Sequence, residues 1–301
     1  MIQIGSVVWP GLVGIGAGLV KGTASFLAYG ELADSVEVGS ITRELRRGND
    51  GQTVWKYPEE KALKHNAGMP NPGAANIALE LKDAQLKIKV PWGLNIAVSP
   101  GLVGTPTAVE DIVATATLAL GGGLRPDWLT LNVSSPDTDD KIAMLMDPQR
   151  VWALCKALKG ELAKFSNIPL WLKIAPAQER AQYAAIAKVI LEVGVETVVA
   201  TNTMADGPEE IGGWCGEPLR AQSSALVWEM NQLLGGKVPI VAVGGVYEGK
   251  HVQDKLAVGA SAVQVVSALL FRGREAARTI RREYEILVAE EKERELGRSS
   301  S

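Results

Sequence analysis

The chain has 301 residues, of which 47% are hydrophobic and 22% charged, and its formal net charge is -3. A hydrophobic fraction of this size excludes an intrinsically disordered chain, and the slightly acidic balance argues against the basic surface that a nucleic-acid partner requires. Only Cys155 and Cys215 are present, too few for a disulfide framework or a zinc cluster, so we expect a cytoplasmic protein without a metal site.

The first twenty residues carry no charged side chain, a composition that also occurs in signal peptides and membrane anchors. Pro10 and the glycines from Gly11 to Gly18 make a poor spanning helix, and no basic segment precedes them. We interpret the stretch as a strand that leads into a ligand loop, and we expect no integral membrane segment.

Eight short apolar runs rich in Val, Ile and Leu recur along the chain, each ending in small or polar residues. Nearly continuous apolar runs, rather than alternating ones, are typical of parallel strands covered on both faces. The runs span residues 12–17, 36–41, 92–97, 128–133, 170–174, 197–201, 239–243 and 262–266.

Helical patterns separate most of these runs, and a charged amphipathic helix over residues 273–296 closes the chain. The other helices are expected at residues 23–33, 108–120, 148–165, 179–193, 223–234 and 250–258. Repeated strand and helix units predict an α/β fold, a single (β/α)8 TIM barrel domain over residues 1–301. A doubly wound sheet is the alternative, but no GxGxxG motif follows the first strand.

The connection over residues 42–90 does not fit the repeat. It runs through RRGND, KYPEEK and AGMPNPGAAN without a clear strand or helix pattern. Structureless connections of this length are typical of functional lids or inserted elements. We therefore expect an insertion between the second and third strands that covers the barrel mouth.

Polar residues gather at the predicted strand ends, where TIM barrels carry their catalytic groups. They are Lys21, Ser40, Asn95, Asn132, Ser135, Lys173, Thr201, Asn202, Thr203, Gly244, Gly245 and Ser267. Each asparagine alone fits ordinary turn chemistry. Together, their amides both donate and accept, and so suit a flat ligand with alternating N–H and C=O groups.

The seventh and eighth strand ends favour a phosphorylated ligand. Gly244 and Gly245 leave backbone N–H groups unobstructed, and with Ser267 they predict a phosphate cradle, although the glycines alone would indicate only a tight turn. Lys173 stands inside the apolar run LWLKIAP, where a lysine must face the lumen or suffer a large desolvation cost. We expect this lysine to meet an anion.

The histidines and cysteines give no support to hydrolytic chemistry. His65 and His251 belong neither to an HExxH motif nor to a GxSxG elbow. We expect His251 to be solvated on an outer helix, Cys155 to pack within an amphipathic helix, and Cys215 to serve as a spacer near the mouth.

Ten segments follow one another in the order and spacing of a known family. They are AGLVK, VEVGSIT, NAGMPNPG, LNIA, NVSSPDT, LKIAP, VVATNT, GGWCGEPLR, VAVGGV and GASAVQVVSALLFRG. Each is weakly specific, but the ordered set covers nearly the whole chain. The sequence thus resembles the dihydroorotate dehydrogenase family, FMN-dependent oxidoreductases that oxidise dihydroorotate to orotate in pyrimidine biosynthesis.

The resemblance implies an FMN site and a substrate site. The FMN-binding residues would be Ala17, Gly18, Ser40, Asn95, Asn132, Lys173, Thr201, Gly216, Gly244, Gly245 and Ser267. The substrate-binding residues would be Lys21, Asn71, Asn132, Asp137, Asn202 and Thr203.

The resemblance also implies catalytic roles for Ser135, Lys173 and Thr203. Ser135 would remove a proton beside the substrate carbonyl while the adjacent carbon gives a hydride to the flavin N5, and Lys173 would favour the reduced, anionic flavin. Because a lone serine is a weak base, it needs a proton path and a water-poor loop. Thr203 and the 42–90 connection are the candidates for these supporting roles.

Two features separate this chain from the usual family pattern. Quinone-linked members share its serine base and first-motif lysine but carry an amino-terminal extension that docks on the membrane, whereas soluble members share its short start but usually have a cysteine base. The electron acceptor is therefore open, and so is the oligomeric state, with a homodimer as one option.

The second departure is Asp137, which replaces an asparagine of the family. Beside a substrate carboxylate at ~4 Å, in an effective dielectric of ~20, an ionised Asp137 would cost about 4 kcal/mol. Either Asp137 turns away, or it is protonated, or the substrate differs, and Lys21 would offset the charge in part. The alternatives are an FMN-dependent paralogue acting on another cyclic amide or an unsaturated acid, and a non-redox phosphate-ligand barrel such as a Schiff-base aldolase using Lys173.

Overall fold

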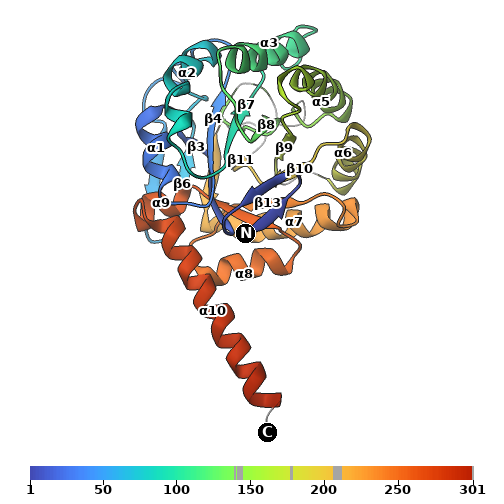
Figure 1. The fold of residues 1–301 in the computed structure, drawn as a ribbon. Helices are drawn as coiled ribbons and strands as arrows, with labels where there is room; N and C mark the ends of the chain where they lie inside the picture. Colours follow the sequence, from blue (N-terminus) through green and yellow to red (C-terminus); the bar gives the residue numbers. More distant parts are fainter. Residues whose placement is uncertain (139, 141–144, 177–178, 206–211, 300–301) are drawn as a thin grey trace.

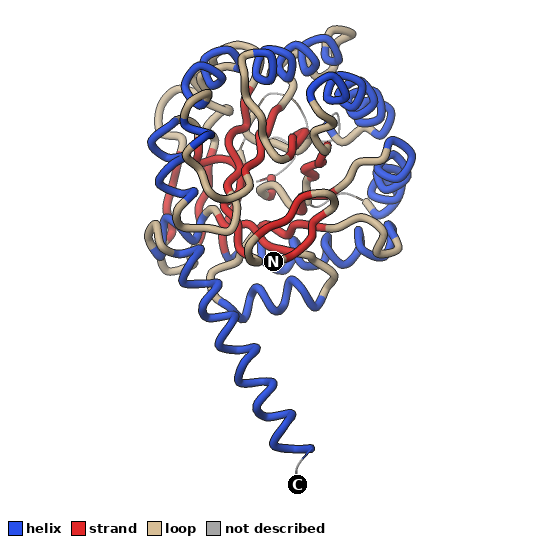
Figure 2. Tube along the Cα trace, viewed as in Figure 1, coloured by secondary structure: helices blue, strands red, loops and turns tan. Residues whose placement is uncertain are grey.

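In the computed structural model, eight parallel strands close into a barrel that is ringed by helices (Figures 1 and 2). The structure describes residues 1–138, 140, 145–176, 179–205 and 212–299. The barrel strands are β3 (Val13–Val20), β4 (Val36–Ile41), β7 (Trp92–Ile96), β8 (Trp128–Asn132), β9 (Leu170–Ile174), β10 (Thr197–Ala200), β13 (Ile240–Val243) and β14 (Ala262–Val265). They coincide with the eight predicted runs, and the predicted TIM barrel is confirmed.

The barrel closes where β14 pairs with β3, in the register Val263↔Val13. The helices outside it are α1 (Thr23–Gly30), α2 (Ala74–Leu81), α3 (Ala108–Gly121), α5 (Pro148–Leu162), α6 (Arg180–Val193), α7 (Arg220–Leu234), α8 (Gly249–Ala257), α9 (Ser267–Arg272) and α10 (Ala276–Ser299). The carboxyl end of α10 extends away from the barrel (Figure 1). No helix in the described part of the chain is long and apolar enough to cross a membrane.

Local sequence accounts for several helix ends. Asp147 precedes α5, and its Oδ1 accepts a hydrogen bond from the backbone N–H of Arg150 at 2.9 Å, while Pro148 occupies the first helical turn. Both features are favourable because the first N–H groups of a helix lack partners within the helix. Helices α6 and α7 end at glycines with left-handed backbone angles, Gly194 and Gly235, which is the usual helix stop.

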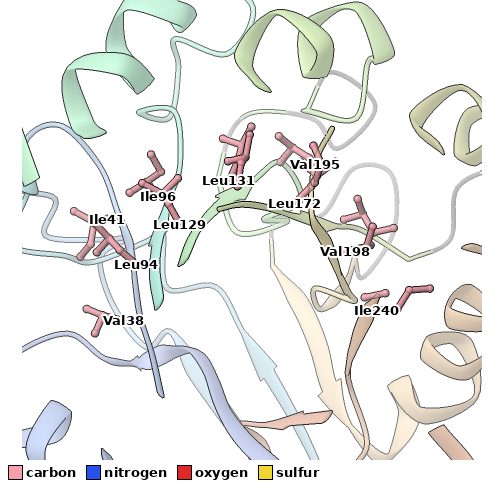
Figure 3. Packing of buried hydrophobic residues seen from close by; sticks show 14 of the residues in the cluster. Val38, Ile41, Leu94, Ile96, Leu129, Leu131, Leu172, Val195, Val198 and Ile240 are labelled. Carbon is pink, nitrogen blue, oxygen red and sulfur yellow. The ribbon is translucent and has the colours of Figure 1, made fainter. Parts of the chain in front are cut away.

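The main hydrophobic core lies between the barrel and the helices. Leu94, Leu131 and Val198 are fully buried, and Figure 3 shows them with neighbouring side chains from successive strands. Because each strand alternates its faces, the residues between them point into the barrel. The helices therefore cover one apolar face, while the other face builds the lumen.

A second core fills the amino-terminal end of the lumen. The chain begins with a hairpin of β1 (Ile2–Ile4) and β2 (Val7–Trp9), which lies across this end of the barrel (Figure 1). Trp9 packs at 5.7 Å from Trp128 and 6.2 Å from Trp171, measured between ring centroids. The sequence indicated a strand and a ligand loop here but not the hairpin, which closes the bottom of the barrel.

Replacement of Trp9 by alanine should destabilise the fold. The indole is fully buried in the lumen core, so its removal leaves a cavity beside the stacked rings of Trp128 and Trp171. We expect the free energy of unfolding to fall by about 3 kcal/mol. Urea denaturation measures this change, and a Val8→Ala variant is the control, because Val8 is largely exposed on the same strand. Equal losses in the two variants would show that the tryptophan does not support the barrel.

The connection over residues 42–90 is not structureless, so that part of the expectation was wrong. It contains β5 (Val54–Tyr57), β6 (Ala62–His65) and the outer helix α2. The two strands join β11 (Met204–Ala205) and β12 (Gly213–Gly216) in a sheet of order β11-β12-β6-β5. Two connections far apart in sequence thus share one sheet. Its strands were missed because they are short, and because β6 pairs with a segment more than a hundred residues away.

His251 is buried rather than solvated, which corrects the second expectation. It lies on α8 as predicted, but its Nδ1 accepts a hydrogen bond from the backbone N–H of Tyr247 at 3.2 Å. The imidazole accepts from a backbone N–H at the turn that leads into the helix. Because a buried N–H without a partner is costly, this hydrogen bond favours burial of the ring over its exposure to water. Cys155 is fully buried in the core, as expected.

Lys255 gives the fold a pH dependence on the alkaline side. Its ammonium is buried and donates to Ser223 Oγ at 2.8 Å, yet burial lowers the pKa of Lys255 to about 7, and the nearby Arg220 acts in the same direction. An unfolded lysine titrates near 10.5, so the unfolded chain binds more protons between these two values. The free energy of unfolding should therefore rise with pH in this window, by at most about 1.4 kcal/mol per pH unit.

A Lys255→Met variant should lose this part of the pH dependence. Urea denaturation at about pH 7 and about pH 9 compares the two proteins. The wild-type chain should gain stability between these pH values, and the variant should gain less. An identical gain in both proteins would assign the dependence to another group.

Candidate active site

A cavity opens at the carboxyl ends of the barrel strands. Its empty volume is about 1180 Å³, part of which is open to solvent, and strands β5, β6 and β12 contribute to its walls. The predicted site residues in its lining are Ala17, Gly18, Lys21, Ser40, Asn132, Ser135, Asp137, Lys173, Thr201, Asn202, Thr203, Gly216, Gly244, Gly245 and Ser267.

Two predicted site residues are not in the cavity wall. Asn95 is fully buried behind Ser40, whose hydroxyl donates to Asn95 Oδ1 at 2.6 Å. Asn71 lies in the loop before α2, where its side chain accepts from the backbone N–H groups of Thr42 at 3.1 Å and Gly73 at 2.9 Å. Here Asn95 supports the wall, and Asn71 fixes the loop beside it.

A buried carboxylate organises the base of the cavity. Glu37 on β4 is fully buried and accepts from Asn95 Nδ2 at 2.9 Å and from Gln264 Nε2 at 2.7 Å. Gly39 has a φ of +120°, and a Cβ there would lie 2.3 Å from the carbonyl oxygen of Asn95, so only glycine lets the two strands approach here. Glu37 was not among the predicted site residues, although an acid inside the apolar run VEVGSI indicates a buried polar role.

Asn132 and Asn202 hold the side chain of Ser135 in place. Asn132 Nδ2 donates to Ser135 Oγ at 3.1 Å and to Ser40 Oγ at 2.9 Å. Asn132 Oδ1 accepts from Asn202 Nδ2 at 3.2 Å. These residues lie at or just after the carboxyl ends of strands β4, β8 and β10, so the barrel brings them together. The Ser135 hydroxyl consequently has a fixed position at the cavity wall.

Lys173 enters the cavity from the lumen. Strand alternation places it two residues above Trp171 on the same face of β9. Burial lowers the pKa of Lys173, and the charge of Glu37 counteracts that effect. Among the described residues its ammonium makes no hydrogen bond, so it is available to an anionic or electron-rich ligand.

Asp137 lies in the cavity wall and is ionised near neutral pH. Its Oδ2 accepts from the backbone N–H of Gly68 at 3.1 Å and lies 3.6 Å from His65 Nδ1. Burial raises the pKa of Asp137, but His65 and the backbone donors outweigh it and hold the pKa below its usual value. Asp137 therefore neither turns away from the cavity nor carries a proton.

Lys21 and His65 face Asp137. Lys21 Nζ donates to the carbonyl of Pro70 at 2.5 Å, and burial lowers its pKa while Asp137 raises it in part. His65 lines the same cavity, and its Nε2 lies 3.2 Å from Thr203 Oγ1. No sequence motif singles out His65, which belongs to neither an HExxH nor a GxSxG motif. Its position was missed because strand β6 was not predicted.

Opposite the acidic end, glycines form a tight cradle. Gly244 and Gly245 have left-handed φ values of +117° and +69°, and a Cβ on Gly245 would lie 2.4 Å from Cβ of Arg220. Ser267 lines the cavity beside them. Cys215 lines the wall, and burial raises the pKa of its thiol to about 12, which keeps it protonated and matches a spacer rather than a nucleophile.

Comparison with known proteins gives one consistent family. A family model described as dihydroorotate dehydrogenase matches residues 2–287. The dihydroorotate dehydrogenase (quinone) of Cellvibrio japonicus is 31% identical over 291 residues, covering 90% of this chain and 82% of that protein. The protein of the same name from Pseudomonas fluorescens is 32% identical over 287 residues, with 90% and 82% covered.

Solved structures agree with this result. The ligand-free type DHODH from Eimeria tenella superposes with a TM-score of 0.86 at 26% identity, covering 96% of this chain and 87% of that one. The same protein in complex with ferulenol gives a TM-score of 0.87 at 26% identity, covering 96% and 84%.

Proposed function

The chain belongs to the dihydroorotate dehydrogenase family and is an oxidoreductase of the CH–CH type, and from this premise we propose that it oxidises dihydroorotate to orotate in pyrimidine biosynthesis, with FMN as its cofactor. One observation carries the proposal. Ser135 and Lys173 line the same cavity, and among the described residues the Lys173 ammonium makes no hydrogen bond, so one side chain can act as a base while the other is available to an electron-rich cofactor.

The residues of the cavity fit FMN. Gly244, Gly245 and Ser267 line the cavity, where backbone N–H groups and a hydroxyl can be presented to a phosphate. Ala17 and Gly18 have small side chains or none and so leave space for a flat ring against this part of the wall. A Cβ on Gly18 would meet no atom within 4 Å. Lys173, which lines the same cavity, would supply a positive charge to a bound flavin. When bound, FMN supplies the hydride acceptor.

Ser135 is the proposed base. Its hydroxyl accepts from Asn132 Nδ2 at 3.1 Å, and Ser135 lines the cavity. It removes the proton on the carbon beside the substrate carbonyl, and Asn132 and Asn202 bind the amide edge of the ring. Strands β5, β6 and β12 cover the site and reduce the water around the base.

The negative charge of Asp137 bears on which substrate the cavity can accept. Lys21 offers a cation to the substrate carboxylate, whereas the ionised Asp137 in the same wall opposes it. This observation favours a second candidate function, an FMN-dependent paralogue acting on a cyclic amide without a carboxylate. Family membership, in contrast, favours redox chemistry over a Schiff-base aldolase.

Anaerobic mixing with substrate separates these candidates. The FMN-loaded protein is mixed with dihydroorotate or with dihydrouracil, which lacks the carboxylate, while the flavin absorbance is followed. Rapid bleaching by dihydroorotate supports the proposal. Bleaching by dihydrouracil alone supports the paralogue, and an intact absorbance with both compounds rejects dihydroorotate as substrate. The aldolase would be supported if the purified protein is colourless and borohydride traps a covalent adduct between the protein and a carbonyl substrate.

The electron acceptor is the next point to test. The relatives from Cellvibrio japonicus and Pseudomonas fluorescens carry quinone in their names, so a quinone is the acceptor we propose first. Reduced protein should be reoxidised faster by a soluble quinone than by fumarate or NAD. We also propose a cytoplasmic location, supported by the two free cysteines, and a homodimer, which sedimentation can test.

A further inference from the structure

Three side chains in the cavity wall form a continuous line of contacts. Thr203 Oγ1 lies 3.2 Å from His65 Nε2, and His65 Nδ1 lies 3.6 Å from Asp137 Oδ2. All three residues line the cavity that contains Ser135. The order hydroxyl, imidazole, carboxylate is one in which an imidazole accepts a proton at one nitrogen while the carboxylate stabilises the resulting cation.

The sheet over the mouth builds this line. His65 ends β6, and its register partner on β12 is Gly213. A Cβ on Gly213 would lie 2.5 Å from Thr203 Oγ1, so the missing side chain makes room for the hydroxyl between the strands. Asp137 is fixed from the other side by the backbone N–H of Gly68. Segments far apart in sequence are therefore packed to hold this contact.

Exposure distinguishes the middle residue from its partners. The His65 side chain is 24% exposed, whereas that of Asp137 is 7% exposed and Ser135 is buried. A proton taken from a substrate inside the cavity has to reach bulk water. The imidazole lines the cavity and is more exposed than Asp137 and Ser135, so it is the group that can hand a proton to water.

We propose that His65 carries the substrate proton out of the cavity, receiving it through the Thr203 hydroxyl, and that Asp137 positions and stabilises its ring. This inference rests on the proposed function, because it starts from the proton that Ser135 removes. His65 acts through Thr203 and is a positioning residue and proton carrier rather than a group that touches the reacting carbon.

The transfer is balanced at each atom. Ser135 Oγ takes the proton from the substrate carbon, and its own hydroxyl proton passes to Thr203 Oγ1 directly or through one water. As Thr203 receives this proton, it gives its original proton to Nε2 of His65, which becomes an imidazolium beside the Asp137 carboxylate. The imidazolium then loses one proton to solvent water. No electrons move in these steps, since the hydride leaves separately to FMN.

A purely structural role is the alternative that a test must separate. In that case His65 would only tie β6 to the loop that holds Asp137. Glutamine at position 65 can still contact both partners by hydrogen bonds, but it cannot accept a proton near neutral pH. If His65 is only a structural tie, the His65→Gln variant should keep the wild-type rate of flavin reduction. If His65 carries a proton, the variant should be slower.

The protonation state of the ring gives a test that needs no substrate. The FMN-loaded protein is labelled with ¹⁵N-histidine, and because the chain has two histidines, a His251→Gln sample assigns the signals. We expect a neutral His65 with its proton on Nδ1 and a hydrogen-bond acceptor at Nε2, and a Thr203→Val variant should lose that bond. A proton on Nε2, or a doubly protonated ring at neutral pH, would overturn the proposal, because neither form can accept from Thr203.

Single-turnover flavin reduction by dihydroorotate tests the transfer itself. His65→Gln and Thr203→Val should each slow the reduction by about tenfold or more at saturating substrate, with little change in substrate affinity. Thr203→Ser should retain most of the rate, and imidazole in the buffer should restore part of it to a His65→Ala variant. A His65→Gln protein that keeps the wild-type rate, or that loses affinity alone, would overturn the proposal.

The two measurements distinguish failure of this inference from failure of the proposed function. If dihydroorotate does not bleach the wild-type flavin, the proposed substrate is wrong, and the proton position on His65 alone decides the inference. If dihydroorotate bleaches the wild-type flavin and the His65 and Thr203 variants are reduced at the same rate as the wild type, the proposed function stands and the inference fails.

Discussion

A Ser135→Ala variant is expected to lose about 10²- to 10⁴-fold in the rate of flavin reduction by dihydroorotate. The hydroxyl is the only part of Ser135 that the change removes, and Asn132 Nδ2, which donates to it at 3.1 Å, keeps its bond to Ser40. The cavity should therefore keep its shape, its FMN and its affinity for orotate. Anaerobic stopped-flow absorbance measures the reduction rate, and orotate titration of the flavin spectrum measures the affinity.

The neighbouring hydroxyl supplies a matched control for this prediction. Ser134 also follows β8, but its Oγ donates to the carbonyl of Lys173 and to Asn132 Oδ1, and it is not in the cavity wall. A Ser134→Ala variant should lower stability more than it lowers the reduction rate. Full single-turnover reduction by Ser135→Ala would remove Ser135 from its assigned role and direct attention to another base.

A Lys173→Met variant is expected to slow flavin reduction by about 10²- to 10³-fold, the usual effect of losing one preorganised electrostatic contact at a reacting centre. It should also lower the midpoint potential of the bound FMN, because a positive charge stabilises the electron-rich reduced ring. Glu37 keeps its hydrogen bonds to Asn95 and Gln264, so the base of the cavity should remain intact. Stopped-flow kinetics and a dye-equilibrated potential measurement give the two values.

Charge and side-chain length can be separated at this position. A Lys173→Arg variant retains the positive charge, and it should keep a midpoint potential closer to that of the wild type than Lys173→Met does. FMN content serves as the common reference, since the glycine cradle at Gly244 and Gly245 is unchanged in both variants. An unaltered potential in Lys173→Met would mean that the ammonium does not lie near the flavin ring.

The barrel itself could be predicted because its signal is local and repeated. Each strand, such as β8 or β13, is a short apolar run that ends in polar or small residues, and the repetition specifies a closed parallel sheet. The polar strand ends then follow from topology, because parallel strands present all their carboxyl ends at one side. For this reason Ser135, Lys173 and Asn202 were expected in one cavity, and all three line it.

Short or isolated elements were not predictable in the same way. The β1–β2 hairpin and strands β5, β6, β11 and β12 have two to four residues each, too few to establish a periodic pattern. The burial of His251 depends on one backbone donor at Tyr247, which no periodicity reveals. Glu37 lay within a predicted strand, but its partners Asn95 and Gln264 come from two other strands.

The sequence by itself determined the barrel, the order of its strand ends and the family to which their motifs belong, since each of these is written in contiguous residues. Only the tertiary structure decided the state of Asp137 and the place of His65. These two residues and Thr203 stand at positions 65, 137 and 203 and meet through a sheet that joins separate connections. Such a contact depends on packing between distant segments, so no local pattern encodes it.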